Sequence, residues 1–295
     1  MKPSNLSLLA LLTTLSACGG GSGGNGNPTV NPPAIPAPGG ATADDLFSST
    51  LQSALAAEMP LSSSDGNAFV KLENGKLTIT NKMDYNFEIK ISDFAPNGKA
   101  VVDAGINSHL TPAEAAGIGF PGANMTKNPL TVQLGGKSAG LEYAEFGYWD
   151  AGEMHIYEGN TFKGTLRDGI GVVFMGGVAS SIQPPINSAT SFTGRAYGWL
   201  FEEHGNKTLL SGTASLTFNN NQHNLSANFN NGANVLTCND CANASSFTLT
   251  GHGTFNKAYY TPQFYGASTA TEVVGILRGT QGESKYFDMS FGARK

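Results

Sequence analysis

Charged side chains are scarce in this chain. Only 13% of the 295 residues are Asp, Glu, Lys or Arg, and 17 basic residues against 22 acidic ones leave a net charge of −5. A nucleic-acid-binding protein needs a basic face to neutralise phosphates, so this composition argues against a nucleic-acid partner. Long apolar runs are also lacking, because none reaches the roughly 18–20 residues of a membrane-spanning helix.

Motifs that would indicate catalysis or a metal site are lacking as well. The sequence has no H-E-x-x-H pair, P-loop or calcium loop. Gly117–Gly122 matches G-x-G-x-x-G, but it follows a predicted helix, and Pro121 stands where the next helix would open. Gly20–Gly24 matches G-x-S-x-G in a glycine tract that cannot form a nucleophile elbow. We expect no enzyme activity and no metal centre. Haem ligation stays possible through a tyrosine or one of five scattered histidines: His109, His155, His204, His223 and His252.

The N-terminus reads as an export signal followed by an anchor. A short positive start and a ten-residue apolar stretch lead to Leu15-Ser16-Ala17-Cys18, which resembles a bacterial lipobox. We therefore predict a signal peptide at 1–17 and lipidation of Cys18; a plain secretory signal is the alternative. Residues 18–40 are rich in Gly and Pro, carry no charge and are predicted to form a tether. Gly19 after the cysteine resembles the sorting pattern of outer-membrane lipoproteins.

Residues 41–137 read as a small mixed region. Thr42 to Met59 is predicted to be a helix, capped by Thr42 and ended by Pro60. Two alternating runs flank Asn74-Gly75, which is a strong hairpin signal. A further strand is predicted over 85–91, and Thr111-Pro112 is typical of a helix start.

Strand-like runs broken by Gly, Asn and Ser recur from residue 138 to 295. Eight antiparallel strands of this kind can close into a barrel, which removes both exposed edges. We therefore predict a mainly β protein with a small handle domain at 41–137, built of strands and short helices, packed on an eight-stranded antiparallel β-barrel at 138–295. The predicted barrel strands are Leu141–Tyr148, Ile170–Phe174, Phe192–Phe201, Leu209–Phe218, Leu225–Phe229, Phe247–Gly251, Val273–Leu277 and Tyr286–Phe291.

Cysteine is rare, with three residues in all. Apart from Cys18, only Cys238 and Cys241 remain, in a polar stretch between two strands. Outside the cytoplasm such a pair predicts a disulfide. A redox or metal role is the alternative, but a metal site needs about four ligands and no second cysteine pair exists.

Three apolar stretches are candidates for partner binding, because exposed apolar patches often mark interaction sites. Each has a structural alternative: the first and third could fill the junction between handle and barrel, and the second could be a barrel strand facing inward. The candidates are Ile118, Phe120 and Met125 in a Gly-rich connection; Met154, His155, Ile156 and Tyr157; and Tyr259 and Tyr260 before Thr261-Pro262.

Several stretches together resemble the Slam-dependent surface lipoproteins, a family that includes transferrin-binding B proteins, factor H binding protein, hemophilins and haemoglobin–haptoglobin utilisation protein A (HpuA). The similarity is greatest to the last of these and covers most of 138–295. It rests on the lipobox and tether and on four further stretches: 141–149 (LEYAEFGYW), 192–196 (FTGRA), 272–275 (EVVG) and 291–295 (FGARK).

The resemblance implies a handle packed on a barrel, displayed outside the cell by a lipid anchor in the outer membrane. It also implies a binding function: capture of host haemoglobin, free or bound to haptoglobin, for haem-iron acquisition with a TonB-dependent outer-membrane receptor. The alternatives within the family are a direct haem binder like hemophilin, and a binder of transferrin or of a complement regulator for immune evasion.

Overall fold

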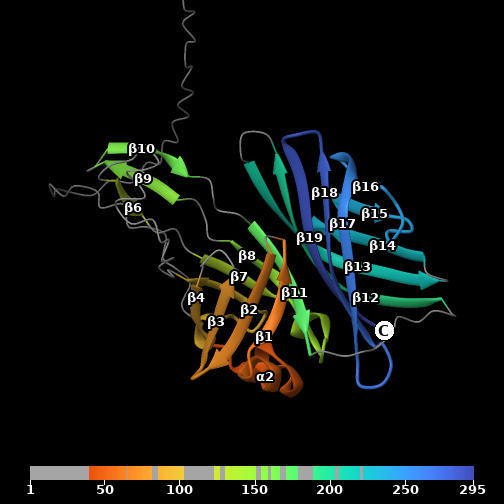
Figure 1. Cartoon of the computed structure of the whole chain (residues 1–295), viewed down its shortest axis with the longest axis horizontal. Coiled ribbons are helices and arrows are strands. Elements are labelled where there is room, and N and C mark those ends of the chain that lie inside the picture. Colours follow the sequence, from red (N-terminus) through yellow and green to blue (C-terminus); the bar gives the residue numbers. More distant parts are fainter. Residues whose placement is uncertain are drawn as a thin grey trace, which may run out of the picture. The chain divides into compact units, whose positions relative to one another are not determined.

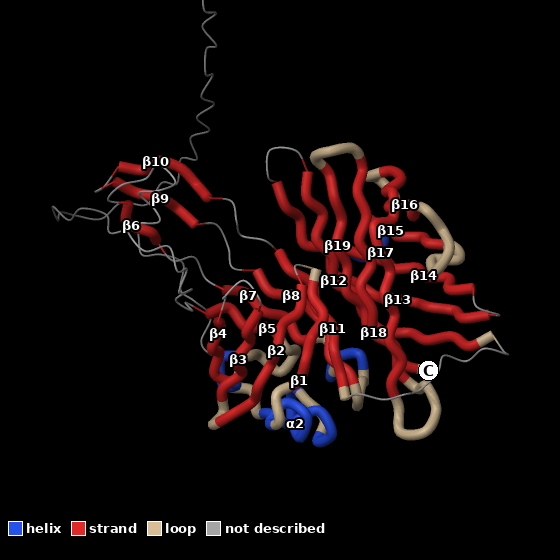
Figure 2. Tube along the Cα trace, viewed as in Figure 1, coloured by secondary structure: helices blue, strands red, loops and turns tan. Residues whose placement is uncertain are grey.

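The computed structural model confirms a mainly β fold (Figures 1 and 2). No helix in the described part of the chain combines the length and the apolar character needed to cross a membrane. The structure describes residues 40–64, 66–81, 86–102, 123–126, 130–150, 154–158, 161–166, 171–178, 189–202, 206–219 and 222–295.

An eight-stranded antiparallel sheet, which we call the handle sheet, forms the N-terminal part of the fold. Its β2–β3 hairpin confirms the predicted turn, since Asn74 and Gly75 both adopt positive φ angles, of 53° and 72°. In spatial order the strands are β4 (Asn86–Lys90), β3 (Lys76–Asn81), β2 (Gly66–Glu73), β1 (Met59–Ser63), β11 (Gly171–Gly177), β8 (Ala144–Asp150), β7 (Leu130–Leu134) and β5 (Lys99–Val102).

Two short helices pack on this sheet where one helix over 42–59 was predicted: α1 (Ala43–Leu46) and α2 (Ser49–Ala56). The break lies at Phe47, whose backbone is extended. Ser48 causes it locally, because its hydroxyl caps the second helix by accepting from the N–H of Leu51 (3.1 Å). The break turns Phe47 into the handle core beside Leu51, where both are almost fully buried.

Eight strands close into an antiparallel barrel at the C-terminal end, as predicted. Its interior is filled by a cluster of aromatic and aliphatic side chains that includes Phe192, Phe229 and Phe287. In order the strands are β12 (Thr190–Glu202), β13 (Asn206–Asn219), β14 (Gln222–Phe229), β15 (Asn234–Cys238), β16 (Ser246–Leu249), β17 (Gly253–Tyr265), β18 (Glu272–Gln281) and β19 (Lys285–Arg294). The short 3₁₀ helices are η1 (Ile91–Asp93), η2 (Lys137–Ala139) and η4 (Asn230–Gly232).

The strand pairing corrects the predicted list of barrel strands. The runs 141–148 and 170–174 were assigned to the barrel, but they form β8 and β11, which pair with each other inside the handle sheet. Two barrel strands, β15 and β17, were not predicted. β17 carries Lys257 and Pro262, which obscure its alternation, and Pro is unusual inside a sheet. β16 pairs with β17 only as far as Asn256. At Pro262, β17 therefore has a paired strand on one side only, which is β18.

The handle sheet and the barrel share a core, and Phe146 of β8 lies at its centre. A Cβ atom added at Gly292 of β19 would be 2.2 Å from the Phe146 ring, so the absence of a side chain there lets the ring contact the barrel wall. The ring also stacks on Tyr197 of β12, with 5.7 Å between the centroids. The Ser290 hydroxyl donates to the carbonyl of Gly147 across the same junction (2.8 Å).

A buried carboxylate of the barrel fastens the other end of this junction. Glu272 is 3% exposed, and its two oxygens accept from the backbone N–H groups of Glu142 (2.5 Å) and Tyr143 (3.0 Å). Arg294 adds a bond from its guanidinium to the carbonyl of Gly140 (2.8 Å). Charge-assisted bonds of this kind are stronger than neutral ones, so the polar fastening complements the apolar contact.

The predicted disulfide is confirmed. Cys238 and Cys241 are bonded across a tight turn, with Cα atoms 5.2 Å apart. The turn is held in place from two strands. The N–H of Cys241 donates to the carbonyl of His223 on β14 (2.5 Å), and the Lys257 ammonium on β17 donates to the carbonyl of Cys241 (2.6 Å). The disulfide turn thus bridges β14 and β17 where β15 and β16 are too short to do so.

Glu145 of β8 is a second buried carboxyl group, and hydrogen bonds stabilise its ionised form only in part. One oxygen accepts three backbone N–H bonds, from Gly135, Gly136 and Phe146. The other oxygen, Oε2, has no hydrogen-bond partner among the described residues. Burial dominates over the three bonds and raises the pKa of Glu145 from 4.5 to about 7.

This shift predicts a measurable pH dependence. Between about pH 4.5 and pH 7 the folded protein keeps a proton that the unfolded chain releases, so the free energy of unfolding falls as the pH rises through this window. The always neutral variant Glu145→Gln lacks this effect. We expect wild type to lose melting temperature relative to Glu145→Gln between pH 4.5 and 7.5. The exposed-site variant Glu283→Gln should keep a constant difference from wild type. A constant difference for Glu145→Gln as well would contradict the assignment.

Candidate protein-binding surface

The sequence candidates fall in different parts of the structure. Ile118 and Phe120 lie outside the described residues. Met125 lies on β6 (Ala123–Thr126), and residues 154–157 lie on β9 (Met154–Glu158). These two strands and β10 (Thr161–Leu166) form a separate three-stranded antiparallel sheet. Met125 is directly opposite Ile156, so the pairing brings two of the predicted stretches together, and β9 is not a barrel strand.

The two candidate tyrosines of β17 face opposite sides of the barrel wall. Tyr260 packs against the interior core, where its ring lies 6.2 Å from that of Phe291 and 5.8 Å from that of His223. Burial raises the pKa of the Tyr260 phenol. Tyr259, one residue earlier, points outward and is half-buried. Successive side chains of a strand alternate in this way, so Tyr259 alone is placed to meet a partner.

Tyr259 begins a row of directly paired residues on the outer wall. Tyr259 is opposite Arg278 on β18, Arg278 is opposite Asp288 on β19, and Asp288 is opposite Trp199 on β12. The next pair towards the strand ends is Phe201 and Tyr286. We call these residues, apart from Asp288, the aromatic–arginine strip: Tyr259, Arg278, Trp199, Phe201 and Tyr286.

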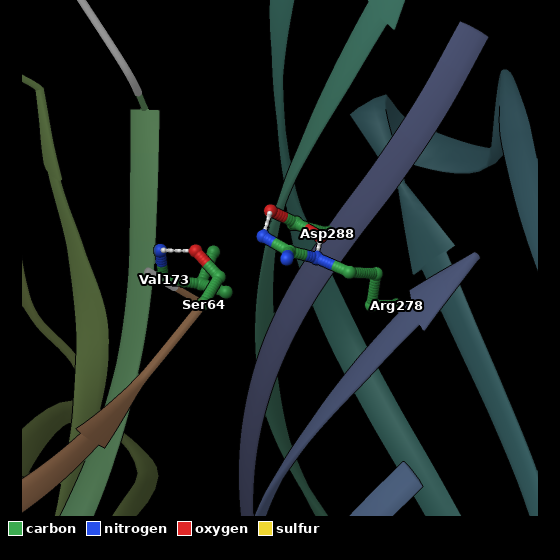
Figure 3. Close-up of polar contacts among 4 residues, drawn as sticks. All are labelled: Ser64, Val173, Arg278 and Asp288. Carbon is green, nitrogen blue, oxygen red and sulfur yellow. Dashed lines mark hydrogen bonds and ion pairs between the residues drawn. The ribbon is translucent and has the colours of Figure 1, made fainter. Parts of the chain in front are cut away.

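An ion pair fixes the centre of the strip (Figure 3). Two guanidinium nitrogens of Arg278 face the Asp288 carboxylate, with Nε–Oδ1 at 2.5 Å and Nη2–Oδ2 at 2.6 Å. The Asp288 side chain is 1% exposed and the Arg278 side chain 30%. Hydrogen bonding to Asp288 raises the pKa of Arg278. The central carbon of the guanidinium lies over the Tyr259 ring, 5.6 Å from its centroid.

The other end of the strip is a stack of rings. Tyr286 and Phe201 stack with centroids 4.1 Å apart, and Tyr286 is 37% exposed. Trp199 lies next to Phe201 and is buried, and the Lys207 ammonium is 5.4 Å from the centroid of its ring. Lys207 is itself paired with Asp150 at the end of β8. The strip therefore has a buried aromatic base and an exposed edge formed by Tyr286, with the half-buried Tyr259 and Arg278 beside it.

A polar network braces the hairpins next to the strip. Consecutive strands are antiparallel, so the turns after β12, β14, β16 and β18 share one end of the barrel. Glu202 pairs with Lys285 (3.3 Å) and lies 3.6 Å from His252, whose other ring nitrogen hydrogen-bonds Asn234 (3.0 Å). Each of the four turns contributes one of these residues. The network holds this end of the barrel, and with it the exposed edge of the strip, in one arrangement.

A metal-binding cluster is not visible among the described residues. There, no three His, Cys, Asp or Glu side chains gather closely enough to hold a metal ion. Figure 3 also shows the handle side of the fold, where the Ser64 hydroxyl accepts a bond from the N–H of Val173 (3.3 Å). This contact joins the end of β1 to β11 and is structural.

Sequence analysis missed most members of the strip. Arg278 and Tyr286 were not singled out, because an isolated Arg or Tyr in a strand carries no local signal. Alternation along β18 and β19 places both on the face opposite to the core residues Leu277 and Phe287. Only the pairing of β17 with β18 and of β18 with β19 shows that they are neighbours of Tyr259.

The ion pair at the centre of the strip predicts a large stability effect. Arg278→Gln removes the charge that faces the buried Asp288 carboxylate. We expect a loss of about 3 kcal/mol in the free energy of unfolding, measured by denaturant titration. Lys71→Gln, which removes the exposed Lys71–Glu73 pair (3.2 Å), is the matched control and should leave the midpoint unchanged. Equal midpoints for both variants would contradict the assigned role of Arg278.

No family model matches the chain, and no curated protein is significantly similar to it. Two solved structures are similar to it. A mutant of the vaccine antigen transferrin-binding protein B from Actinobacillus pleuropneumoniae H49 is similar with a TM-score of 0.34 and 15% identity, over 80% of this chain and 98% of that one. A structure described as a surface lipoprotein is similar with a TM-score of 0.33 and 13% identity, over 80% of this chain and 96% of the other.

Proposed function

We propose that this chain is a surface lipoprotein of the bacterial outer membrane that binds host haemoglobin, free or bound to haptoglobin. In this proposal it delivers the complex to a TonB-dependent receptor, which extracts the haem, and the chain itself catalyses no reaction. The lipobox ending at Cys18 and the uncharged Gly- and Pro-rich stretch after it support a lipid-anchored protein held off the membrane surface.

The observation that carries the proposal is the aromatic–arginine strip. Tyr, Trp and Arg are the residues that dominate the energetics of protein interfaces, where a few buried anchors contribute most of the affinity. Tyr286 and Arg278 are exposed on one side and held on the other by Phe201 and Asp288. A partner that covers their exposed edge would complete their burial.

Rigidity strengthens this argument. The strip crosses four neighbouring strands of a closed barrel, and its side chains are already fixed by stacking and by an ion pair. Side chains that are ordered before binding lose less conformational entropy when a partner docks. The polar network of Glu202, His252, Lys285 and Asn234 orders the adjacent hairpins in the same way.

The proposal is tested by biolayer interferometry with the purified full-length chain. Haemoglobin, haemoglobin–haptoglobin, transferrin and a complement regulator are compared as analytes. We expect binding of haemoglobin with Kd between about 1 nM and 10 μM. Tyr286→Ala should weaken it at least about tenfold, as truncation of an interface anchor does. Phe69→Ala is the matched control, because Phe69 is also an exposed aromatic residue (44%) but lies on the handle sheet, and its binding should equal that of wild type.

Three other results would change or refute the proposal. Binding of transferrin or the complement regulator in place of haemoglobin would replace the proposed partner while keeping the class of function. Equal losses for Tyr286→Ala and Phe69→Ala would move the binding surface away from the strip. If none of the four proteins binds, host-protein capture by this chain is refuted.

Direct haem binding is a second candidate, which one buried pair favours. His223 Nδ1 and Tyr260 Oη are both buried and have no hydrogen-bond partner among the described residues. Burial lowers the pKa of His223, which favours the neutral imidazole that can ligate iron. Titration of the full-length chain with haemin should then shift the Soret band, and His223→Ala should abolish the shift. A flat titration of wild type would exclude this candidate.

A further inference from the structure

A row of hydroxyl groups crosses the outer wall of the barrel, away from the aromatic–arginine strip. The row runs through six consecutive strands, from β12 to β17, and every neighbouring pair in it is directly opposite in the strand register. All six side chains are exposed. Neighbouring strands lie about 4.8 Å apart, so the hydroxyls repeat at that interval. The members are Thr193, Ser215, Ser226, Thr237, Thr248 and Thr254.

The wall is hollowed at the end of the row where η2 lies beside β12. The hollow has a volume of about 490 Å³. Its polar lining consists of hydroxyl groups, one amide and one guanidinium, and its apolar lining of Ala and Gly only, with no aromatic ring and no carboxylate. Such a lining offers hydrogen bonds in many directions and no pocket for an apolar side chain. The polar residues that line it on β12, β13 and β14 are Thr193, Arg195, Thr213, Ser215, Ser226 and Asn228.

Arg195 supplies the charge of the hollow. Its Nε donates to the carbonyl of Ser138 (3.3 Å), which anchors the exposed side chain on one side. Within the described part of the chain, Arg195 forms no ion pair. Arg294 is opposite Thr193 in the register of β12 and β19, so a second cation lies near the hollow. The nearby acidic group Glu272 is engaged by the backbone N–H groups of Glu142 and Tyr143. Arg195 is therefore the charged residue that lines the hollow, in a chain with a net charge of −5.

We propose that this hollow binds a carboxylated sugar of a glycan. The guanidinium presents two parallel N–H donors to a carboxylate, a geometry that Arg satisfies better than Lys. The Thr, Ser and Asn side chains of β12, β13 and β14 donate to and accept from the hydroxyl groups of the sugar ring. The hydroxyl row continues from the hollow along the wall and offers further contacts to neighbouring sugars of the same chain.

This inference does not rest on the proposed haemoglobin binding. Arg195 and the strip residue Trp199 are four residues apart on β12, and no residue of the strip lines the hollow. A variant of the hollow can therefore lose sugar binding while haemoglobin binding is retained, and a Tyr286 variant can show the reverse.

The test is isothermal titration of the full-length chain with 3′-sialyllactose, which carries one carboxylate, and with lactose, which carries none. We expect saturable binding of sialyllactose with Kd of about 1 mM or tighter and at least about tenfold weaker binding of lactose. Arg195→Gln should reduce sialyllactose affinity at least about tenfold, and Thr213→Ala about threefold. Thr248→Ala, which removes a hydroxyl of the row outside the hollow, should bind as wild type does.

Several outcomes would overturn the proposal. They are equal affinity for lactose and sialyllactose, unchanged affinity in Arg195→Gln, competition by inorganic sulfate as effective as by sialyllactose, or no saturable binding up to about 10 mM. Sulfate competition would indicate a simple anion site without sugar recognition. If thermal melting shows that Arg195→Gln does not fold, the affinities of Thr213→Ala and Thr248→Ala for sialyllactose are compared instead, because each variant removes one exposed hydroxyl. Equal affinities of these two variants would overturn the proposal.

Discussion

The contact between the Phe146 ring and the bare backbone of Gly292 is the constraint on which the rest of the structure depends. It lets β8 of the handle sheet lie directly on β19 of the barrel, and the bond from Ser290 to the carbonyl of Gly147 follows from that approach. A Cβ at Gly292 would collide with the ring at 2.2 Å, so the two sheets would have to separate. The shared core of Tyr148, Tyr197, Trp199 and Val274 would then be opened to water.

Three of the stretches that carry the family resemblance, 141–149, 272–275 and 291–295, meet at this junction. In the EVVG stretch, the Glu272 carboxylate accepts hydrogen bonds from the backbone N–H groups of Glu142 and Tyr143. In the FGARK stretch, Gly292 receives the Phe146 ring and Arg294 binds the carbonyl of Gly140. The resemblance therefore concerns residues that hold a handle on a barrel, which explains why it predicts the architecture. It contains neither Arg278 nor Tyr286, so it does not identify the partner.

The outer wall of the barrel carries two surfaces of different chemistry. The aromatic–arginine strip places rings and one guanidinium over a buried base, an arrangement suited to a protein partner. The hydroxyl row and its hollow place small polar groups around Arg195, an arrangement suited to a sugar. Both lie on hydrogen-bonded strands of the closed barrel. Neither surface uses the interior, which is filled by Phe side chains, so the barrel serves as a rigid support for its outer face.

Local patterns predicted the elements whose cause is local. Asn74-Gly75 predicts the hairpin because both residues tolerate positive φ. The two cysteines three positions apart predict the disulfide because the third cysteine, Cys18, is predicted to carry the lipid. Alternation predicts most strands and the mainly β class. The α1–α2 break was missed because the cap at Ser48 competes with an otherwise continuous helical pattern.

Tertiary structure alone decided which strands belong together. β8 and β11 have the same alternating texture as the barrel strands, but they pair with each other in the handle sheet, and the unpredicted β15 and β17 complete the barrel. The same holds for the binding surface: Tyr259, Arg278 and Tyr286 are far apart in the chain and become neighbours only when β17, β18 and β19 pair. The physical reason is that strand alternation specifies two faces for each strand but not its neighbours, which depend on long-range hydrogen bonding and on the closure of the barrel.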